Sequence, residues 1–227
     1  MSAIISLEKV SKIYNLGTAK EVVALKDVSL QIKRSSLVLL MGPSGSGKST
    51  LLSLIAALTR PTSGKVVVDG QTISKLPDRF AAVYRREKIG FIFQKFNLLE
   101  DLTVFENVIV PLIPTPTPLK ELELMASAVM ERFAIAHKKD MVVRKLSGGE
   151  QQRCAIARAL IDNPPIILAD EPTANLDSAL TEQFLQILGQ LKQEGKTIVI
   201  ATHDPRFADL EIVDEIYEVR EGNVFLS

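Results

Sequence analysis

The 227-residue sequence has few of the features that mark several large classes of protein. It contains one cysteine, Cys154, so it can form neither an internal disulfide framework nor a cysteine metal site, and a reducing cytoplasm is the simplest setting. Its 27 basic and 27 acidic residues cancel, so no basic excess points to nucleic acid. No apolar run approaches the ~20 residues of a membrane-spanning helix, and the N-terminus lacks a signal peptide's charged start and long apolar centre. We therefore expect a cytoplasmic protein without a nucleic-acid partner, which would act at a membrane only through a partner that spans it.

The stretch over residues 42–49 carries the strongest signal in the chain. It reads Gly-Pro-Ser-Gly-Ser-Gly-Lys-Ser, fits the pattern G-x-x-x-x-G-K-S/T, and follows an apolar run at residues 37–41 that predicts a strand. Glycines let successive backbone N–H groups turn toward phosphate oxygens, and the N-terminus of the following helix adds its dipole. Lys48 is expected to reach the β and γ phosphates and Ser49 to bring its hydroxyl to Mg2+. A Gly/Ser turn before a helix is the structural alternative. The predicted site for ATP and Mg2+ comprises Gly42, Pro43, Ser44, Gly45, Ser46, Gly47, Lys48, Ser49 and Thr50.

A second glycine-containing stretch lies far downstream and reads Leu146-Ser147-Gly148-Gly149-Glu150. Ser147 and Glu150 have the spacing of a capping box that begins a helix over residues 151–160. A cap alone does not explain two adjacent glycines, because each glycine costs backbone entropy on folding. Glycines at such a position are expected where another group must approach the backbone closely. We interpret this stretch as a second helix N-terminus that binds an anion.

Two carboxylates, Asp170 and Glu171, end the apolar stretch over residues 166–171, and Pro172 prevents that strand from continuing. Carboxylates beside a phosphate loop suit phosphoryl transfer. Asp170 is expected to hold Mg2+ through water, and Glu171 to orient and polarise the water that attacks the γ phosphate. A pair that caps the next helix is the structural alternative.

Hydrophobic patterning and turn residues predict further elements. Strands are predicted at residues 4–10, 28–32, 65–69, 89–93 and 197–201, with a hairpin of residues 216–219 and 224–226. A helix is predicted at residues 120–133, and Thr103 with Glu106 forms another capping box. The prolines at positions 111, 114, 116 and 118 predict an extended loop without helix.

These motifs resemble those of the ATP-binding cassette (ABC) ATPases, whose signature motif reads LSGGE or LSGGQ. The resemblance extends from Tyr14 through Gly222. It implies an α/β fold, a P-loop NTPase of ABC type, with a mostly parallel central sheet, an antiparallel β edge subdomain and a helical subdomain that carries the signature. At 46% hydrophobic residues, the chain can bury such a core as one domain. We expect a single ABC ATPase domain over residues 1–227, with residues 1–93 and 164–227 in the core and about 94–163 in the helical subdomain.

The resemblance implies roles for three more residues. Tyr14, the first aromatic residue of the chain, is expected to stack on adenine; an ordinary loop tyrosine is the alternative. Gln94 follows a predicted strand and is expected to touch Mg2+ and the attacking water; the alternative is a solvent-exposed glutamine. His203 follows the last central strand and is expected to contact the γ phosphate and help to hold the water. One departure is visible at residues 33–36, which read Lys-Arg-Ser-Ser where the family usually has a Pro-Gly or Gly-Glu turn.

In this family, the signature of one subunit closes over the γ phosphate held by the phosphate loop of another. The resemblance therefore implies a head-to-tail dimer of two copies around two ATP molecules. Asp177 ends the stretch 174–177, which resembles the D-loop that crosses the dimer interface in the family. The residues expected to contact the nucleotide of the other subunit are Ser147, Gly148, Gly149 and Glu150.

The resemblance also implies an integral membrane permease as a partner and a peripheral location on the cytoplasmic face of the membrane. The family receives a coupling helix of the permease next to Gln94, and apolar residues around Phe96 are expected to line that groove. The motifs look most like the branch that contains MacB, LolD and FtsE. Two functions follow: a transporter ATPase that drives export or extraction of a lipophilic, peptide or lipoprotein cargo, or an FtsE-like signalling ATPase that moves no cargo. A DNA-repair or translation ATPase is disfavoured, because neither a long coiled-coil insertion nor a second cassette is present.

Overall fold

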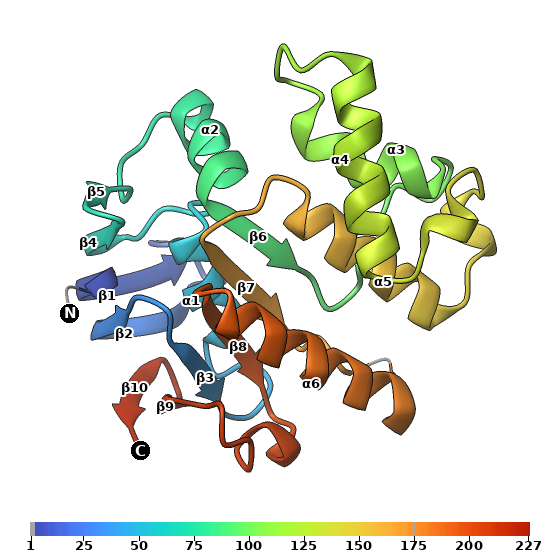
Figure 1. Ribbon diagram of the computed structural model, residues 1–227. Helices are drawn as coiled ribbons and strands as arrows, with labels where there is room; N and C mark the ends of the chain where they lie inside the picture. Colours follow the sequence, from blue (N-terminus) through green and yellow to red (C-terminus); the bar gives the residue numbers. More distant parts are fainter. Residues whose placement is uncertain (1–2, 175) are drawn as a thin grey trace.

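The computed structural model describes residues 3–174 and 176–227, whose strands form two sheets (Figure 1). The first is antiparallel with strand order β2-β1-β4-β5; the second has the order β10-β9-β3-β8-β7-β6 and is parallel except at the β10–β9 hairpin. The strands are β1 (Ala3–Tyr14), β2 (Val22–Lys33), β3 (Leu37–Met41), β4 (Ser63–Val68), β5 (Gln71–Thr72), β6 (Ile89–Ile92), β7 (Ile166–Asp170), β8 (Thr197–Thr202), β9 (Glu215–Arg220) and β10 (Asn223–Leu226).

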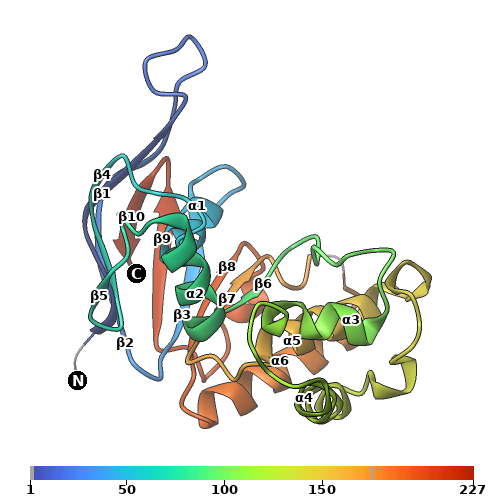
Figure 2. The same ribbon diagram turned by 90° about the horizontal axis from the view of Figure 1, so that it is seen from above.

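Helices cover the sheets in layers. Figure 2 shows the antiparallel sheet on one side of the central sheet and α3, α4, α5 and α6 on the other. The helices are α1 (Lys48–Ile55), α2 (Asp78–Lys88), α3 (Val104–Ile109), α4 (Leu119–Arg132), α5 (Gly148–Leu160) and α6 (Ser178–Gln193), with 3-10 turns η1 (Val110–Leu112), η2 (Ala136–Lys138), η3 (Val143–Lys145) and η4 (Pro205–Phe207). Within the described ranges 3–174 and 176–227, no helix is both long and apolar enough to cross a membrane.

Strand β3 shows why the central sheet is buried on both faces. Its side chains alternate, so Leu37 and Leu39 pack into the cluster shared with the helical lobe, whereas Val38 and Leu40 pack toward α1 and the antiparallel sheet. All four are fully buried. Parallel strands covered on both faces read as near-continuous apolar runs, which is the pattern seen in the sequence. The predicted α/β architecture is confirmed, with phosphate loop, strand ends and last hairpin at the expected positions.

Several local predictions are wrong or incomplete. β1 and β2 run beyond the predicted 4–10 and 28–32, because register shifts interrupt their pairing and break the alternation on which the prediction rested. The extended loop predicted for the proline segment begins instead with η1, since Pro111 lies in its first turn, where no N–H donor is required. In the atypical 33–36 turn, Ser35 adopts a left-handed φ of 57° and donates its hydroxyl to the Gly195 carbonyl at 3.0 Å.

Helices α2 and α6 occupy stretches for which no element was predicted. α2 buries only Ala81 and Tyr84, so its apolar stripe is narrow and its sequence reads as a charged surface segment. α6 buries Phe184, Leu188 and Leu191, whose spacing is that of one face of a helix, so this helix could have been predicted from the sequence.

Candidate functional site

The loop between β3 and α1 requires glycine at two positions because it lies against the protein's own backbone. A Cβ on Gly42 would lie 2.2 Å from the Val219 carbonyl oxygen, and one on Gly47 would lie 2.6 Å from that of Ala24. Both glycines, with φ of 155° and 116°, adopt conformations that side-chain-bearing residues rarely reach. These glycines therefore fix the loop on β9 and β2, in addition to allowing a ligand to approach.

Lys48 is the first residue of α1, and its side chain, which turns back onto this loop, leaves only 5% of the residue's surface exposed. Its Nζ donates to the carbonyl oxygens of Gly42 (2.6 Å) and Pro43 (3.1 Å) and lies 3.6 Å from Glu171 Oε1. Next to it, the buried Ser46 hydroxyl has no hydrogen-bond partner among the described residues. A nearly buried ammonium and an unsatisfied buried hydroxyl, in a glycine-containing loop that leads into a helix N-terminus, fit an anion such as the phosphates of ATP.

Ser49 and Asp170 come together from opposite halves of the chain. The Ser49 hydroxyl donates to Asp170 Oδ1 at 3.0 Å, since α1 begins where β7 ends. Burial raises the pKa of Asp170 above its ordinary value, and the negative charge of Glu171 acts in the same direction. In the described part of the chain, no cluster of three or more His, Cys, Asp or Glu forms a ready metal cage. One carboxylate and one hydroxyl fit Mg2+, which takes its remaining ligands from phosphates and water.

Glu171 is held in a strained conformation at the end of β7. Its φ is 45°, unusual for a residue with a side chain, and its N–H donates to the Ala201 carbonyl at 2.8 Å. Its Oε2 lies 3.0 Å from His203 Nδ1, while its Oε1 faces Lys48. The carboxylate therefore lies between a histidine and an ammonium, and its side chain is only 12% exposed.

One cavity of 410 Å³ joins most of the predicted residues. Those that line it are Tyr14, Ser44, Gly45, Gly47, Lys48, Ser49, Thr50, Gln94, Glu171 and His203. Sequence reasoning missed three further lining residues, Val22, Val23 and Ala24. Val22 pairs with Tyr14 across the β1–β2 ladder and is 56% exposed; both facts depend on the fold, so no signal in the sequence identifies this residue. The apolar wall of Tyr14 and the two valines suits the face of an aromatic base.

The signature residues do not line this cavity. Ser147 and Gly148 are exposed at the N-terminus of α5, where the predicted capping box is present: the Ser147 N–H donates to Glu150 Oε2 at 2.8 Å, and the Glu150 N–H donates to Ser147 Oγ. The bonds that the Ser147 N–H and hydroxyl donate to the carboxylate lower the pKa of Glu150. Gly149 packs closely against α6: a Cβ there would lie 2.6 Å from the end of the Leu180 side chain, which would have to shift.

Asp177 also lies outside the cavity and accepts a hydrogen bond from the Leu180 N–H at 2.9 Å, so it caps α6. Asn175, which forms part of the predicted D-loop, lies outside the described residues. Among the described residues, the cavity that contains Lys48 and Glu171 and the exposed N-terminus of α5 are therefore separate.

We expect Ser147→Ala to lower the free energy of unfolding by about 1 kcal/mol, because it removes the side-chain acceptor at the start of α5. Thr103→Ala, which breaks the matching capping box of α3, should cost a similar amount. Urea unfolding measures both. If the Ser147 residue acts across a dimer, only Ser147→Ala should also weaken dimerisation driven by ATP; equal dimerisation of the two variants would contradict that role.

Comparison with known proteins agrees with the fold. The family model described as "ABC transporter" matches residues 25–174. An uncharacterized ABC transporter ATP-binding protein of Thermotoga maritima is 44% identical over 227 residues, covering 99% of this chain and 94% of that protein. The macrolide export ATP-binding/permease protein MacB of Salmonella choleraesuis is 41% identical over 99% of this chain but only 34% of its own length.

Among solved structures, a dimeric post-hydrolysis state of the ATP-binding cassette MJ0796 bound to ADP and Pi matches with a TM-score of 0.89 and 42% identity, covering 97% of this chain and 96% of that one. MJ0796 is a protein of Methanocaldococcus jannaschii. The chain belongs to the ABC transporter family and is an ATP-binding cassette that hydrolyses ATP. The resemblance, the fold class and the ATPase activity predicted from the sequence are thereby confirmed.

Proposed function

We propose that this cassette drives a separate membrane permease in export or extraction of a lipophilic, peptide or lipoprotein cargo, from a peripheral position on the cytoplasmic face of the membrane. The main support for this mechanism is that the signature and the cavity lie apart within one copy of the chain. The signature residues do not line the cavity with Lys48 and Glu171, and Ser147 and Gly148 are exposed at the N-terminus of α5. Two copies packed head to tail would complete two sites. Residues 1–227 would form a single ABC ATPase domain, with residues 1–93 and 164–227 in the catalytic core and its antiparallel β part and about 94–163 in the helical subdomain.

Each cavity residue has a role that its surroundings support. Lys48 would bind the β and γ phosphates, and Tyr14 would stack on adenine. Ser49 and Asp170, already in contact at 3.0 Å, would hold Mg2+ together with Gln94. When bound, Mg2+ neutralises charge that develops on the transferred phosphoryl group.

Glu171 would orient the attacking water and accept its proton at the carboxylate, because its Oε2 is anchored by His203 while its other oxygen faces the phosphate loop. His203 would in addition contact the γ phosphate. From the second copy, the partner's Ser147, the partner's Gly148, the partner's Gly149 and the partner's Glu150 would close the site, and Asp177 would lie at the interface.

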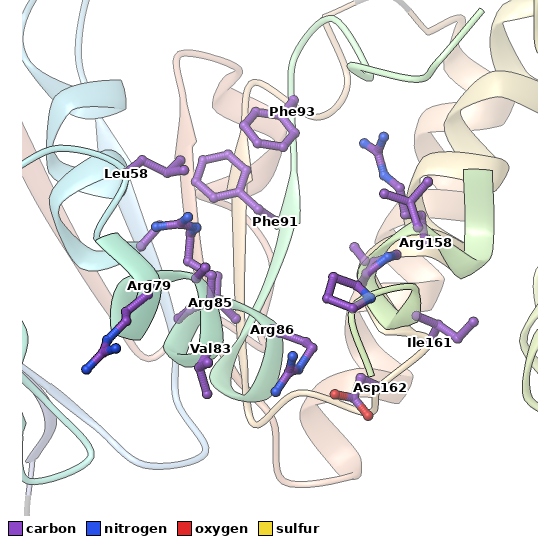
Figure 3. A pocket seen from close by; sticks show the side chains of 17 residues that line it. Leu58, Arg79, Val83, Arg85, Arg86, Phe91, Phe93, Arg158, Ile161 and Asp162 are labelled. Carbon is purple, nitrogen blue, oxygen red and sulfur yellow. The ribbon is translucent and has the colours of Figure 1, made fainter. Parts of the chain in front are cut away.

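The permease would bind a groove of 680 Å³ beside the strand end that carries Gln94. Its apolar lining differs from the one predicted around Phe96: Leu58 and the stacked pair Phe91 and Phe93 form one wall. Figure 3 shows these side chains facing Arg158 and Ile161 across the groove, with Val83 and three arginines of α2 nearby. Pro111 and Pro114 also line it, which gives the proline segment a use that its sequence did not reveal.

The charge of this groove indicates the chemistry of the segment that would bind there. Arg79, Arg85, Arg86 and Arg158 line it, against Asp162 as the acidic residue of the lining set. We expect the permease to insert a short amphipathic helix with an apolar face and at least one carboxylate.

We expect Val83→Glu to abolish capture of the permease, because it adds a charge to the apolar part of the groove at a site that is 40% exposed. Leu124→Glu, on α4 and 73% exposed, is the matched control and should retain capture. Both are made in tagged Glu171→Gln protein, purified from gently solubilised native membranes with ATP and analysed by mass spectrometry. Stabilisation by Mg-ATP should persist in both, which shows that the fold is intact.

The identity of the captured protein decides between two functions. A permease of few spans with a large extracytoplasmic domain supports the proposal, and the cargo-handling proteins that accompany it indicate export. Cell-wall hydrolase regulators among its companions would favour the second candidate, an FtsE-like signalling ATPase that moves no cargo. The similarity to MacB favours the first. Recovery of only soluble or nucleic-acid-bound partners, or equal recovery by Val83→Glu, would overturn the permease proposal.

A further inference from the structure

Arg158 connects the last turn of the signature helix to the loop that follows Gln94. It lies near the C-terminal end of α5, is half-buried, and lines the groove shown in Figure 3. Its Nη1 donates to the Asn97 carbonyl at 2.5 Å and its Nη2 to the Phe96 carbonyl at 2.6 Å. A guanidinium donates to the two successive carbonyls from two nitrogens fixed in one plane, and the single nitrogen of a lysine does not reproduce this geometry.

The loop that Arg158 holds is strained. Phe96 and Asn97 both have left-handed backbones, with φ of 58° and 49°, and neither is a glycine. Two successive residues in this region are unfavourable unless their surroundings hold them there. Downstream, the buried Asn107 accepts from the Leu99 N–H at 2.7 Å and donates to the Leu99 carbonyl at 3.0 Å. Upstream, the loop is continuous with β6. Arg158 thus holds the segment between two fixed ends.

The position of this segment matters because Gln94 lies in the same cavity as Glu171 and His203. A shift of the 95–97 backbone would move Gln94 relative to those groups. ATP binding depends mainly on the phosphate loop, which Arg158 does not touch. Removal of the arginine should therefore affect the chemical step more than ATP affinity.

We propose that Arg158 is a positioning residue for ATP hydrolysis: it fixes the strained loop after Gln94 and ties that loop to the helix that presents the signature to the other subunit. The role assigned to Gln94 rests on the function proposed above, whereas the role of Arg158 in holding the loop does not. Because Arg158 also lines the groove, a segment bound there would contact the side chain that holds the loop.

The test uses the isolated 227-residue chain and therefore needs no membrane partner. Amide hydrogen exchange is read on the loop directly, since the Phe96 and Asn97 N–H groups donate to the carbonyls of Phe93 and Lys95. In Arg158→Met we expect exchange of amides 96–99 to rise about tenfold, while β6 and α5 keep wild-type rates. kcat should fall about tenfold to a hundredfold, with KM for ATP within about twofold of wild type.

Arg132→Met is the matched control, because it removes an arginine of the helical lobe that bonds Glu194 at 2.7 Å and does not touch the loop. It should leave loop exchange and kcat unchanged. Arg158→Lys keeps the positive charge but loses the planar guanidinium, and it should give intermediate values of loop exchange and kcat. This variant also serves as the test if Arg158→Met does not fold. Three results would overturn the proposal. Exchange of the loop amides could stay unchanged, exchange could rise equally in α5 and β6, or kcat could stay at the wild-type value although the loop amides exchange faster. Failure of permease capture by itself would leave it standing.

Discussion

Replacement of Glu171 by Gln is expected to lower the rate of ATP hydrolysis by about 10² to 10³-fold. The substitution keeps the shape of the side chain and its position beside His203, but the amide cannot accept a proton from the attacking water. The strained backbone at this residue should be unaffected, since the side-chain length is the same. Phosphate release under saturating Mg-ATP measures the effect.

The same variant should form a stable dimer with Mg-ATP, because hydrolysis no longer removes the ligand that joins the two copies. Light scattering with and without Mg-ATP detects this dimer. Glu194→Gln, on an exposed turn after α6, is the control and should turn over at the wild-type rate. A Glu171→Gln protein that hydrolyses ATP normally would remove Glu171 from the mechanism, and one that stays monomeric would remove the main support for a head-to-tail dimer.

Replacement of Lys48 by Met should abolish detectable binding of Mg-ATP. The ammonium is buried at the centre of the phosphate loop, and methionine keeps most of the stem while it removes the charge that faces the β and γ phosphates. A ligand at a thousand times its Kd stabilises the folded state by about 4 kcal/mol, so wild-type protein should show a clear rise in Tm with Mg-ATP.

In Lys48→Met that rise in Tm should be absent. Lys65→Met, at an exposed position on β4, should retain it. Because the apo form of Lys48→Met is measured in the same experiment, a general loss of stability is separated from a loss of binding. A full Mg-ATP shift in Lys48→Met would show that phosphate binding does not depend on this lysine.

Local features of this protein were readable from its sequence because their physics is local. The phosphate loop depends on consecutive residues that follow an apolar strand, and the capping boxes of Thr103 and Ser147 depend on a spacing of three residues. Strands β3, β7 and β8 were predictable because burial on both faces demands apolar residues at nearly every position. Strand β1 lacked a regular alternation because of its register shifts, and helix α2 lacked a wide apolar face because it buries only two residues.

Tertiary structure decided which distant residues meet. Ser49 bonds Asp170 across most of the chain because α1 starts where β7 ends, and Glu171 meets His203 because β7 and β8 are parallel neighbours. No pattern in the sequence predicts that Gly149 packs against Leu180, that the proline segment lines a groove, or that Arg158 donates to two carbonyls of a strained loop. These contacts join residues far apart in sequence, so they exist only once the sheet order is set. The sequence by itself determined the chemistry that the chain carries, and only the packed fold determined where each group acts, because distances between elements depend on packing and not on residue spacing.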